Sequence, residues 1–406
     1  MAKQVDVCVV GAGISGASFA FRCAQDGASV AVLEKEPRPG GCIKSYRHND
    51  GLVSELGTRT LTNTYRTVIE LLESAGADHL IEPLETSKFK LAVGNDHKGI
   101  LSRLSFLSIA LSLPNMFGAD KTGKSLKQHY GQVFGKRNYD RLFRHAFSAV
   151  LSQPADDYPA ELLFRKRERD KSRPKQFTLK GGNLTLVEAL LGQANIELMP
   201  STGVTAIARE KQGFRIATSG RDTIKAKSLA IATPSNVAAP LTTDIAPYLS
   251  ALLDELPSGQ LQTVHVALAR DPNRRNVATN LIGVDKPYFS MIHTPSDNRD
   301  IYCFHFNGDA PPPQDQIPEI MSEALQCQPS DIEHISECQS VLPHLSADKL
   351  DTISKIEEYL KTADIYLPCN YLQGLSVEDC CLQSKQEHAR WTTQHLSSVH
   401  NAMTGL

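Results

Sequence analysis

The stretch VDVCVVGAGISGASFAFRCAQDGASVAVLE, residues 5–34, decides the fold of this chain. Residues 5–10 form a β-branched apolar run that is typical of a buried parallel strand, and residues 29–33 form a second one. Residues 17–24, which lie between the two runs, suit a helix. The stretch therefore predicts a strand, a helix and a second strand, which together make the βαβ unit of a parallel sheet.

A glycine-rich turn, GAGISG at residues 11–16, joins the first strand to the helix. Its first glycine permits a tight turn, its second lets a pyrophosphate approach the backbone, and its third lets helix and strand pack closely. The N–H groups at the helix start would face the anion. Glu34 lies 18 residues after the last glycine, near the spacing of a carboxylate that binds ribose hydroxyls. The predicted dinucleotide contacts are Gly11, Gly13, Ile14, Ser15, Gly16 and Glu34.

The length and composition indicate a soluble globular protein of more than one domain. The chain has 406 residues, which suggests two or three domains, and its hydrophobic (41%) and charged (22%) fractions are those of a soluble globular protein. Lys plus Arg (43) nearly balance Asp plus Glu (45), so no strong net field attracts nucleic acid. The nine cysteines include no CxxC pair, so we expect neither a metal site nor a disulfide framework. We find no export signal and expect a cytoplasmic protein.

A second glycine pair follows Glu34 closely, in KEPRPGGC at residues 35–42. Together with Glu34, this segment resembles the E-x-x-x-x-x-G-G-R motif with which the flavin amine oxidase superfamily wraps FAD. The resemblance implies FAD as the cofactor, held noncovalently. It adds four cofactor contacts, with a cysteine where the family has arginine: Lys35, Gly40, Gly41 and Cys42.

Further segments extend the resemblance over nearly the whole chain. ELGTR at residues 55–59 is similar to the E-L-G-P-R segment of protoporphyrinogen oxidases. TLKGGNL at residues 178–184 is similar to the superfamily's L-x-G-G-x-x-x-L helix start, and ATP at residues 232–234 resembles a turn near the dinucleotide. The contacts implied in this middle part are Gly57, Thr58, Val204, Ala232 and Thr233.

The last match lies near the end of the chain. IYLPCN at residues 365–370 and GLSVEDC at residues 374–380 resemble the family's C-terminal flavin motif, although proline and cysteine replace its Ala-Gly. A short strand, a polar turn and a helix from about residue 376 would present another set of helix N-terminal N–H groups to the cofactor. The implied contacts are Asn370, Leu375, Ser376 and Val377.

These matches predict an α/β fold, with a Rossmann-like, doubly wound FAD-binding domain and an inserted α+β substrate domain. We expect the FAD-binding domain in residues 1–85, 180–255 and 315–406. The substrate-binding domain should comprise residues 86–179 and 256–314. The site is expected at the junction of the two, where ligand pockets of such proteins form.

Three local patterns carry expectations of their own. Residues 61–75 read as one helix. Residues 100–117 predict a packed amphipathic helix with serines along one face, or alternatively a surface that touches membrane or an apolar ligand; the segment is too short to span a bilayer. The basic stretch at residues 165–175 predicts a solvated connector, with contact to anionic lipid as the alternative.

The resemblance implies an FAD-dependent oxidoreductase similar to protoporphyrinogen oxidase. Such an enzyme would dehydrogenate a cyclic pyrrole-like or amine-containing small molecule and pass electrons to FAD and then to oxygen or another acceptor. Arg59 is expected to orient the substrate by gripping a carboxylate. A structural arginine paired with Glu55 is the alternative role. A flavin amine or amino-acid oxidase, and a degenerate flavin-binding protein without activity, remain as alternative functions.

Other catalytic signals are weak. We find no Ser/His/Asp triad and no HExxH, and we expect His265, His293 and His305, which fall on predicted strands, to be structural. The expected partners are a small-molecule substrate, no nucleic acid, and at most a peripheral contact with a membrane surface. A homodimer is left open.

Overall fold

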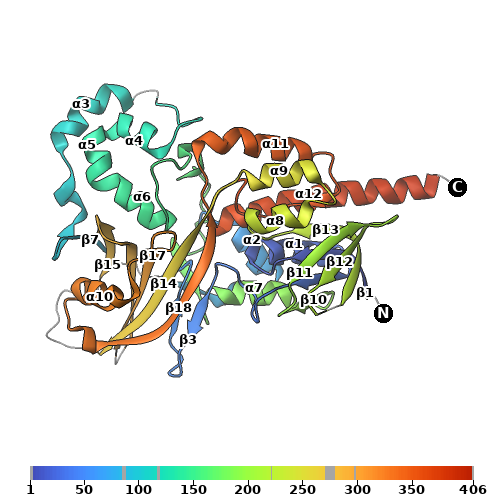
Figure 1. The fold of residues 1–406 in the computed structure, drawn as a ribbon, viewed down its shortest axis with the longest axis horizontal. Coiled ribbons are helices and arrows are strands. Elements are labelled where there is room, and N and C mark those ends of the chain that lie inside the picture. The colour runs from blue at the N-terminus through green and yellow to red at the C-terminus, as the bar shows by residue number, and fades with distance from the viewer. Residues whose placement is uncertain are drawn as a thin grey trace.

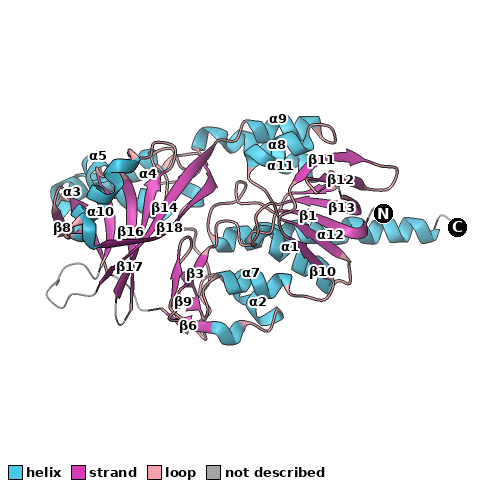
Figure 2. Ribbon diagram, turned by 60° about the horizontal axis from the view of Figure 1, so that its bottom comes forward, coloured by secondary structure: helices cyan, strands magenta, loops and turns pink. Residues whose placement is uncertain are grey.

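The computed structural model describes residues 3–84, 88–116, 119–220, 222–269, 279–296 and 299–404. Two large sheets lie at opposite ends of this part of the chain, as the two views show (Figures 1 and 2). Loops and small sheets connect them in the middle. The fold is α/β, as the sequence predicts.

The first large sheet is the predicted Rossmann-like sheet. It is parallel at its centre and ends in an antiparallel hairpin. Its strands, in sheet order, are β10 (Ile196–Met199), β2 (Val30–Leu33), β1 (Lys3–Val10), β13 (Thr223–Ile231), β12 (Phe214–Thr218) and β11 (Val204–Arg209), and β19 (Ile365–Tyr366) also pairs with β13.

Helices cover both faces of this sheet, which explains why its strands read as continuous apolar runs. Val7 and Val9 of β1 point into one core, and Cys8 and Val10 point into the other. The first face carries α1 (Ile14–Gln25), α7 (Leu184–Leu191), α12 (Val377–Thr404) and α2 (Arg66–Ser74), and the second carries α8 (Ser235–Thr242), α9 (Pro247–Asp254) and α11 (Leu350–Leu360).

The second large sheet is mainly antiparallel. Its strands, in sheet order, are β18 (Ile332–Pro343), β14 (Ser258–Ala269), β17 (Arg299–Asn307), β16 (Tyr288–Pro295), β15 (Asn280–Val284), β7 (Phe89–Val93) and β8 (Asp96–Gly99). One face packs on α10 (Ile317–Leu325) through an apolar core that includes Val264 and Phe304. Beside it stand α3 (Phe106–Met116), α4 (Leu126–Phe134), α5 (Lys136–Asn138) and α6 (Arg144–Leu151) (Figure 1).

Short elements fill the middle of the molecule (Figure 2). The hairpin of β3 (Ser45–Arg47) and β4 (Val53–Glu55) forms one small sheet, and β5 (Leu61–Thr62), β9 (Gln176–Leu179) and β6 (Ile81–Pro83) form another. The single turns are 3-10 at Asp78–Leu80, Ile100–Arg103, Ala160–Leu162, Gln314–Gln316, Pro329–Asp331 and Ala347–Lys349, and π at Tyr139–Phe143.

Two boundaries differ from the sequence predictions. Residues 61–75 do not form one helix, because β5 pairs with β9 before α2 begins at Arg66. The FAD-binding part was expected to resume at residue 315, yet α10 and β18 belong to the second sheet and its core. Long-range strand pairing, which sequence periodicity does not show, decides both boundaries.

Residues 100–116 also differ from the prediction of one packed amphipathic helix, and Phe117 lies outside the described residues. The helix α3 starts only at Phe106. Its serine face lies inward, because a Cβ added at Gly135 would come within 2.2 Å of Ser108 Oγ. Small side chains allow this close approach, and they leave Phe106 and Leu107 each 71% exposed.

No helix in the described ranges is long and apolar enough to cross a bilayer.

Candidate nucleotide and substrate site

The carboxyl ends of the parallel strands bring three predicted site segments to one edge of the first sheet. The N–H of Gly11, which follows β1, donates to Leu33 O of β2 at 2.8 Å. The N–H of Ala232, which follows β13, donates to Val10 O at 2.8 Å. Ligands of open α/β sheets bind at this edge, so the predicted location matches the geometry.

The glycine turn has the shape that its sequence predicts. Gly11 has a φ of +102°, and a Cβ there would lie 2.9 Å from Ala232 O. A Cβ on Gly16 would lie 2.0 Å from Gly11 O, so α1 packs against the turn at a distance that only glycine permits. Gly13 caps α1 without a side chain, which leaves the backbone N–H groups of Ile14 and Ser15 in the first turn available for an anion.

The second glycine pair lies directly against this turn. Gly40 N–H donates to Ala12 O at 2.9 Å, and Gly40 forms a parallel bridge with Gly13. A Cβ on Gly41, whose φ is +59°, would lie 3.2 Å from Gly13 Cα. Two loops 30 residues apart in the sequence thus present bare backbone to the same point. The resemblance-based grouping of Gly13, Gly40 and Gly41 agrees with this contact.

Glu34 occupies the position expected of the ribose carboxylate, at the end of β2. Its carboxylate is buried and accepts hydrogen bonds from Ala12 N at 2.9 Å and from Glu36 N at 3.0 Å. Each oxygen keeps a further lone pair for a hydroxyl donor. The Cβ of Lys35 is 3.7 Å from a Cβ built on Gly203, which precedes Val204 on β11. These residues therefore lie on one side of the glycine turn.

A buried hydroxyl marks the other side of the turn. Thr233 Oγ1 is inaccessible to solvent and has no hydrogen-bond partner among the described residues. Its Cγ2 lies 3.5 Å from a Cβ built on Gly11. Since buried polar atoms nearly always have partners, an orphan hydroxyl beside the glycine turn fits a ligand that supplies one.

The C-terminal motif approaches the same turn through α12. Ser384 Oγ donates to Ser15 O at 2.8 Å, so the first turns of α12 pack against the start of α1. Ser376 is the N-cap of α12, and its hydroxyl accepts from Asp379 N at 3.1 Å. Val377 begins the helix, and Leu375 and Asn370 lie in the loop before it.

Two arginines that the sequence assigned to a solvated connector reach this helix start. Arg167 forms an ion pair with the buried Asp379, and Arg165 Nη1 lies 3.6 Å from the same carboxylate. Arg173 pairs with Glu73 at 2.7 Å. The connector prediction is therefore wrong for these three arginines. Nothing in the local sequence marks them, because their partners lie far along the chain.

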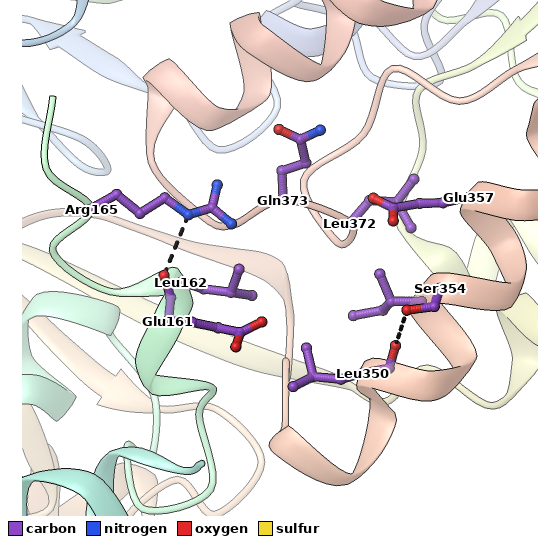
Figure 3. A pocket seen from close by; sticks show the side chains of 9 residues that line it. Glu161, Leu162, Arg165, Leu350, Ser354, Glu357, Leu372 and Gln373 are labelled. Atoms are coloured by element: carbon purple, nitrogen blue, oxygen red, sulfur yellow. Dashed lines mark hydrogen bonds between the residues drawn. The ribbon is translucent and has the colours of Figure 1, made fainter. Parts of the chain in front are cut away.

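A cavity of about 340 Å³ lies beside this ion pair (Figure 3). It is bounded by residues after α6, the first turns of α11 and the loop before α12. The figure shows Arg165, Gln373 and Glu357 around it, with Leu162 and Leu372 among the apolar side chains. No residue that lines this cavity belongs to the predicted site set. We therefore place the candidate site at the glycine loops and not here.

The segment that follows β4 joins the glycine loops to the second sheet. A Cβ on Gly57 would come within 2.1 Å of Cys42 O, and Cys42 Sγ lies 3.7 Å from Val341 O on β18. Glu55 is buried and accepts from Asn183 N at 2.7 Å and from Ser45 Oγ at 2.8 Å. Burial raises the pKa of Glu55 to about 7.

The hydrogen bonds of Glu55 go to Asn183 and Ser45, and Glu55 acts on Arg59 through its charge. Arg59 Nη1 donates to His293 O on β16 at 2.9 Å. Burial lowers the pKa of Arg59 from its ordinary value. Asn183 Nδ2 donates to the carbonyls of Thr58 and Arg59, at 2.8 and 3.0 Å, and holds the backbone of this segment in place.

The three strand histidines are hydrogen-bonded, as expected of structural residues. His265 bonds to Ser54 at 2.8 Å, and His293 Nε2 lies 2.7 Å from Asp300 Oδ1. His305 Nδ1 lies 2.9 Å from Ser290 Oγ. His265 and His305 lie on one face of the second sheet, whereas His293 is paired with Tyr302 and lies on the other face, which packs on α10. Among the described residues, no group of three or more metal-ligating side chains could hold a metal ion.

Comparison with known proteins supports this assignment of the fold. Residues 9–75 match the family model of the NAD(P)-binding Rossmann-like domain. The L-amino-acid oxidase BjussuLAAO-I of Bothrops jararacussu is 41% identical over 71 residues, which are 17% of this chain and 14% of that protein. The aligned region thus spans about one seventh of this relative.

Solved structures match over almost the whole chain. A protein from Exiguobacterium sp. 255-15, provisionally named protoporphyrinogen oxidase, has a TM-score of 0.77 at 15% identity, covering 97% of this chain and 99% of that one. Putrescine oxidase bound to putrescine has a TM-score of 0.66 at 16% identity, covering 97% and 100%. The chain therefore shares the fold of these two proteins, with a Rossmann-like nucleotide-binding domain at its glycine turn.

Proposed function

We propose that this protein is an FAD-dependent oxidoreductase that holds one noncovalent FAD per chain. The observation that carries the proposal is the contact between the two glycine loops, where Gly13, Gly40 and Gly41 meet through bare backbone. Such a surface accepts a pyrophosphate, and the start of α1 supplies N–H groups for its charge.

The residues around this contact fit the rest of the cofactor. Glu34 would bind the ribose hydroxyls and Lys35 and Val204 would lie near the adenine end. The orphan hydroxyl of Thr233 would gain a partner on the opposite side of the turn. Gly57 and Thr58 would flank the flavin end, beside Cys42. No residue in this set has to move far, because the backbone contacts described above already bring these residues together.

The cofactor, when bound, accepts an electron pair from the substrate and passes it to oxygen or another acceptor. The chain's own residues position the substrate and exclude water. We propose that residues 86–179 and 256–314, with α10 and β18, form the substrate-binding part. Arg59 then orients the substrate, because a guanidinium has five N–H donors and the bond to His293 O uses one of them.

Within this class we favour a protoporphyrinogen oxidase-like reaction on a cyclic, pyrrole-like substrate that carries carboxylates. Arg59 supports it, since a guanidinium can bind a carboxylate through two parallel hydrogen bonds. An amine or amino-acid oxidase would share every cofactor contact, and the likeness to an L-amino-acid oxidase extends over 17% of this chain. A flavin-binding protein without activity is the remaining alternative.

Anaerobic reduction of the bound flavin tests the proposal. Porphyrinogen, primary amines and L-amino acids would be added separately to the purified protein without oxygen. We expect porphyrinogen to bleach the flavin absorption. Bleaching by an amine or amino acid alone would reassign the substrate, and an intact flavin that no substrate reduces would favour the binding protein.

We also propose a peripheral contact with a membrane surface through residues 100–107. Leu101 is 68% exposed, Phe106 and Leu107 are each 71% exposed, and α3, which begins at Phe106, lies at the outer end of the helical part (Figure 1). Arg103 would face anionic headgroups. Sedimentation with anionic vesicles should fall when Leu101, Phe106 and Leu107 are changed to serine together, whereas Val150→Ser, at another exposed apolar residue, serves as the control. Equal sedimentation of both variants would refute this contact.

A further inference from the structure

A chain of buried polar side chains links the β3–β4 hairpin to the second sheet. His48 Nε2 lies 2.8 Å from Ser54 Oγ, and Ser54 Oγ lies 2.8 Å from His265 Nε2 on β14. Ser54 is 1% exposed and His265 is 0% exposed. The ring of Tyr46 packs edge-on against both imidazoles, at 4.8 and 5.1 Å between ring centroids. Water therefore cannot easily substitute for any of these bonds.

Arg299, at one end of the chain, sets the direction of the hydrogen bonds. Arg299 Nη2 lies 3.1 Å from His48 Nδ1, and a guanidinium can only donate, so His48 Nδ1 accepts. Neutral His48 then carries its proton on Nε2 and donates to Ser54. Ser54 has one hydroxyl proton, and donating it to His265 Nε2 is the arrangement that gives every group in the chain a partner. His265 therefore carries its proton on Nδ1 and donates to Ser336 Oγ at 3.3 Å.

This sequence of hydrogen-bond donors and acceptors exists only while the imidazoles of His48 and His265 are both neutral. Protonated His48 would turn an N–H toward the N–H of Arg299. Protonated His265 would turn an N–H toward Ser54 and leave the hydroxyl proton without an acceptor. We call the four side chains His48, Ser54, His265 and Ser336 the relay.

The surrounding charges favour the neutral forms. Arg299 on β17 faces His48, with Asp50 and Glu333 as the carboxylates nearby. Burial, followed by His48, Arg299 and His334, lowers the pKa of His265 to about 4. Burial and Arg299 also lower the pKa of His48. Both rings are therefore uncharged near neutral pH, and the relay is complete.

The relay is the first of three hydrogen-bonded contacts between residues 54–59 and the second large sheet. Ser54 bonds to His265 on β14, the backbone of Leu56 bonds to the ring of His305 on β17, and Arg59 bonds to His293 O on β16. These strands are neighbours in the sheet. Residues 54–59 thus lie across the sheet, with Gly57 turned to the glycine loops.

We propose that Ser54 and His265 are positioning residues, whose relay sets where residues 55–59 lie relative to the flavin site. Neither residue touches the proposed cofactor. The proposal rests on the proposed function for its consequence, since Gly57, Thr58 and Arg59 are the contacts that the relay would place. The relay itself requires no cofactor, so its existence and its effect can be tested separately.

Ring nitrogen NMR of protein labelled with ¹⁵N-histidine tests the existence of the relay without flavin. At neutral pH we expect His48 as the Nε2–H tautomer and His265 as the Nδ1–H tautomer, both uncharged. The opposite tautomer on either ring, or a charged ring, would overturn the relay. Assignment uses His48→Gln and His265→Gln, each of which removes one signal.

Titration of the apo protein with FAD tests the positioning role. Ser54→Ala leaves two buried ring nitrogens without a partner, and we expect FAD to bind about tenfold more weakly. Ser54→Thr keeps the hydroxyl and should restore binding to within about threefold. Ser322→Ala, at a buried serine of α10 outside the relay, is the matched control and should bind FAD as the wild type does.

The pH profile separates positioning from a general loss of packing. The hydroxyl of Ser54 donates to the neutral form of His265, so its removal should raise the pKa of that ring. The pH at which FAD affinity falls should then rise in Ser54→Ala, toward the ordinary histidine range near 6.5. Weaker binding with an unmoved pH midpoint, or binding as tight as wild type, would overturn the positioning role.

The positioning role can still be tested if Ser54→Ala does not fold, and the relay can still be tested if the protein binds no FAD. If Ser54→Ala does not fold, His265→Gln, which retains an acceptor at the Nε2 position but has no titrating ring, decides by the same titration: FAD affinity near that of the wild type without its fall at acid pH would support the role, and a fall at the wild-type pH midpoint would overturn it. If the wild type binds no FAD, the proposed function fails together with the positioning role, whereas the tautomers still establish or refute the relay.

Discussion

The glycine loops and the polar face of the second sheet are built in opposite ways. At the loops, Gly13, Gly40 and Gly41 bring backbone together, and no side chain decides the shape. At the sheet, His265 and His305 are buried on neighbouring strands, and their side chains hold a segment from elsewhere in the chain. A site made of backbone leaves a local sequence signature, whereas a site made of distant side chains does not.

The largest expected effect comes from adding a side chain to the backbone site. Gly13→Val should keep the fold, since the nearest atom to a Cβ there is 3.8 Å away, yet it fills the space that a pyrophosphate would need. We expect a largely flavin-free protein, measured by the ratio of flavin to protein absorption.

A second glycine variant serves as the matched control for Gly13→Val. Gly131, in α4, has nothing within 4 Å of a built Cβ, so Gly131→Ala should retain full flavin content. A fully flavinylated and folded Gly13→Val would remove our placement of the cofactor.

The next largest effect concerns the side-chain region. Arg59→Lys should retain FAD and the fold but lose the planar pair of hydrogen bonds to a carboxylate. The loss corresponds to about 1.5 to 3 kcal/mol, or roughly ten- to a hundredfold in kcat/KM. Steady-state kinetics on the substrate that bleaches the flavin measure it. Unchanged turnover of a carboxylate-bearing substrate would assign Arg59 a structural role through His293 O.

The sequence predicted the first region well for a physical reason. The turn from β1 to α1, Glu34 and the second glycine pair all lie within 42 residues, so spacing alone carries their relation. Periodicity could not show that β18 pairs with β14, and it therefore placed β18 in the wrong part of the fold.

The contacts on the polar face of the second sheet could be predicted from the sequence only in part. Alternation along β14 and β17 marked His265 and His305 as residues of predicted strands. Their partners, Ser54 and Leu56, are more than 200 residues away, and neither Ser54 nor the ELGTR segment that contains Leu56 indicates a contact with these strands. The ion pair between Arg167 and Asp379 was not predicted for the same reason, since a run of charged residues resembles a solvated loop. Side-chain contacts between residues far apart in the sequence can be identified only in the folded structure.

The smallest expected effect is a pH dependence of stability that belongs to the side-chain region. Burial lowers the pKa of His265 and of His305 to about 4, against about 6.5 in the unfolded chain. Between these values the unfolded chain binds more protons, so each ring makes the free energy of unfolding fall as the pH drops from about 6.5 to 4. The slope is at most about 1.4 kcal/mol per pH unit for each ring.

Glu55 acts in the opposite direction, because its pKa is raised to about 7 and the folded chain keeps that proton longer. The difference between variants is therefore the useful quantity. In urea unfolding at several pH values, His305→Gln should lose part of the acid-side fall, whereas His79→Gln, at an exposed ring, should keep it. Parallel curves for wild type and His305→Gln would show that this ring does not titrate with unfolding.

The central claim is that the two glycine loops bind FAD, and acid precipitation of the purified protein tests it most directly. The account predicts a yellow protein whose colour passes into the supernatant as one FAD per chain. A yellow pellet would contradict the noncovalent binding. A colourless protein that takes up no FAD when the cofactor is added would contradict the claim itself.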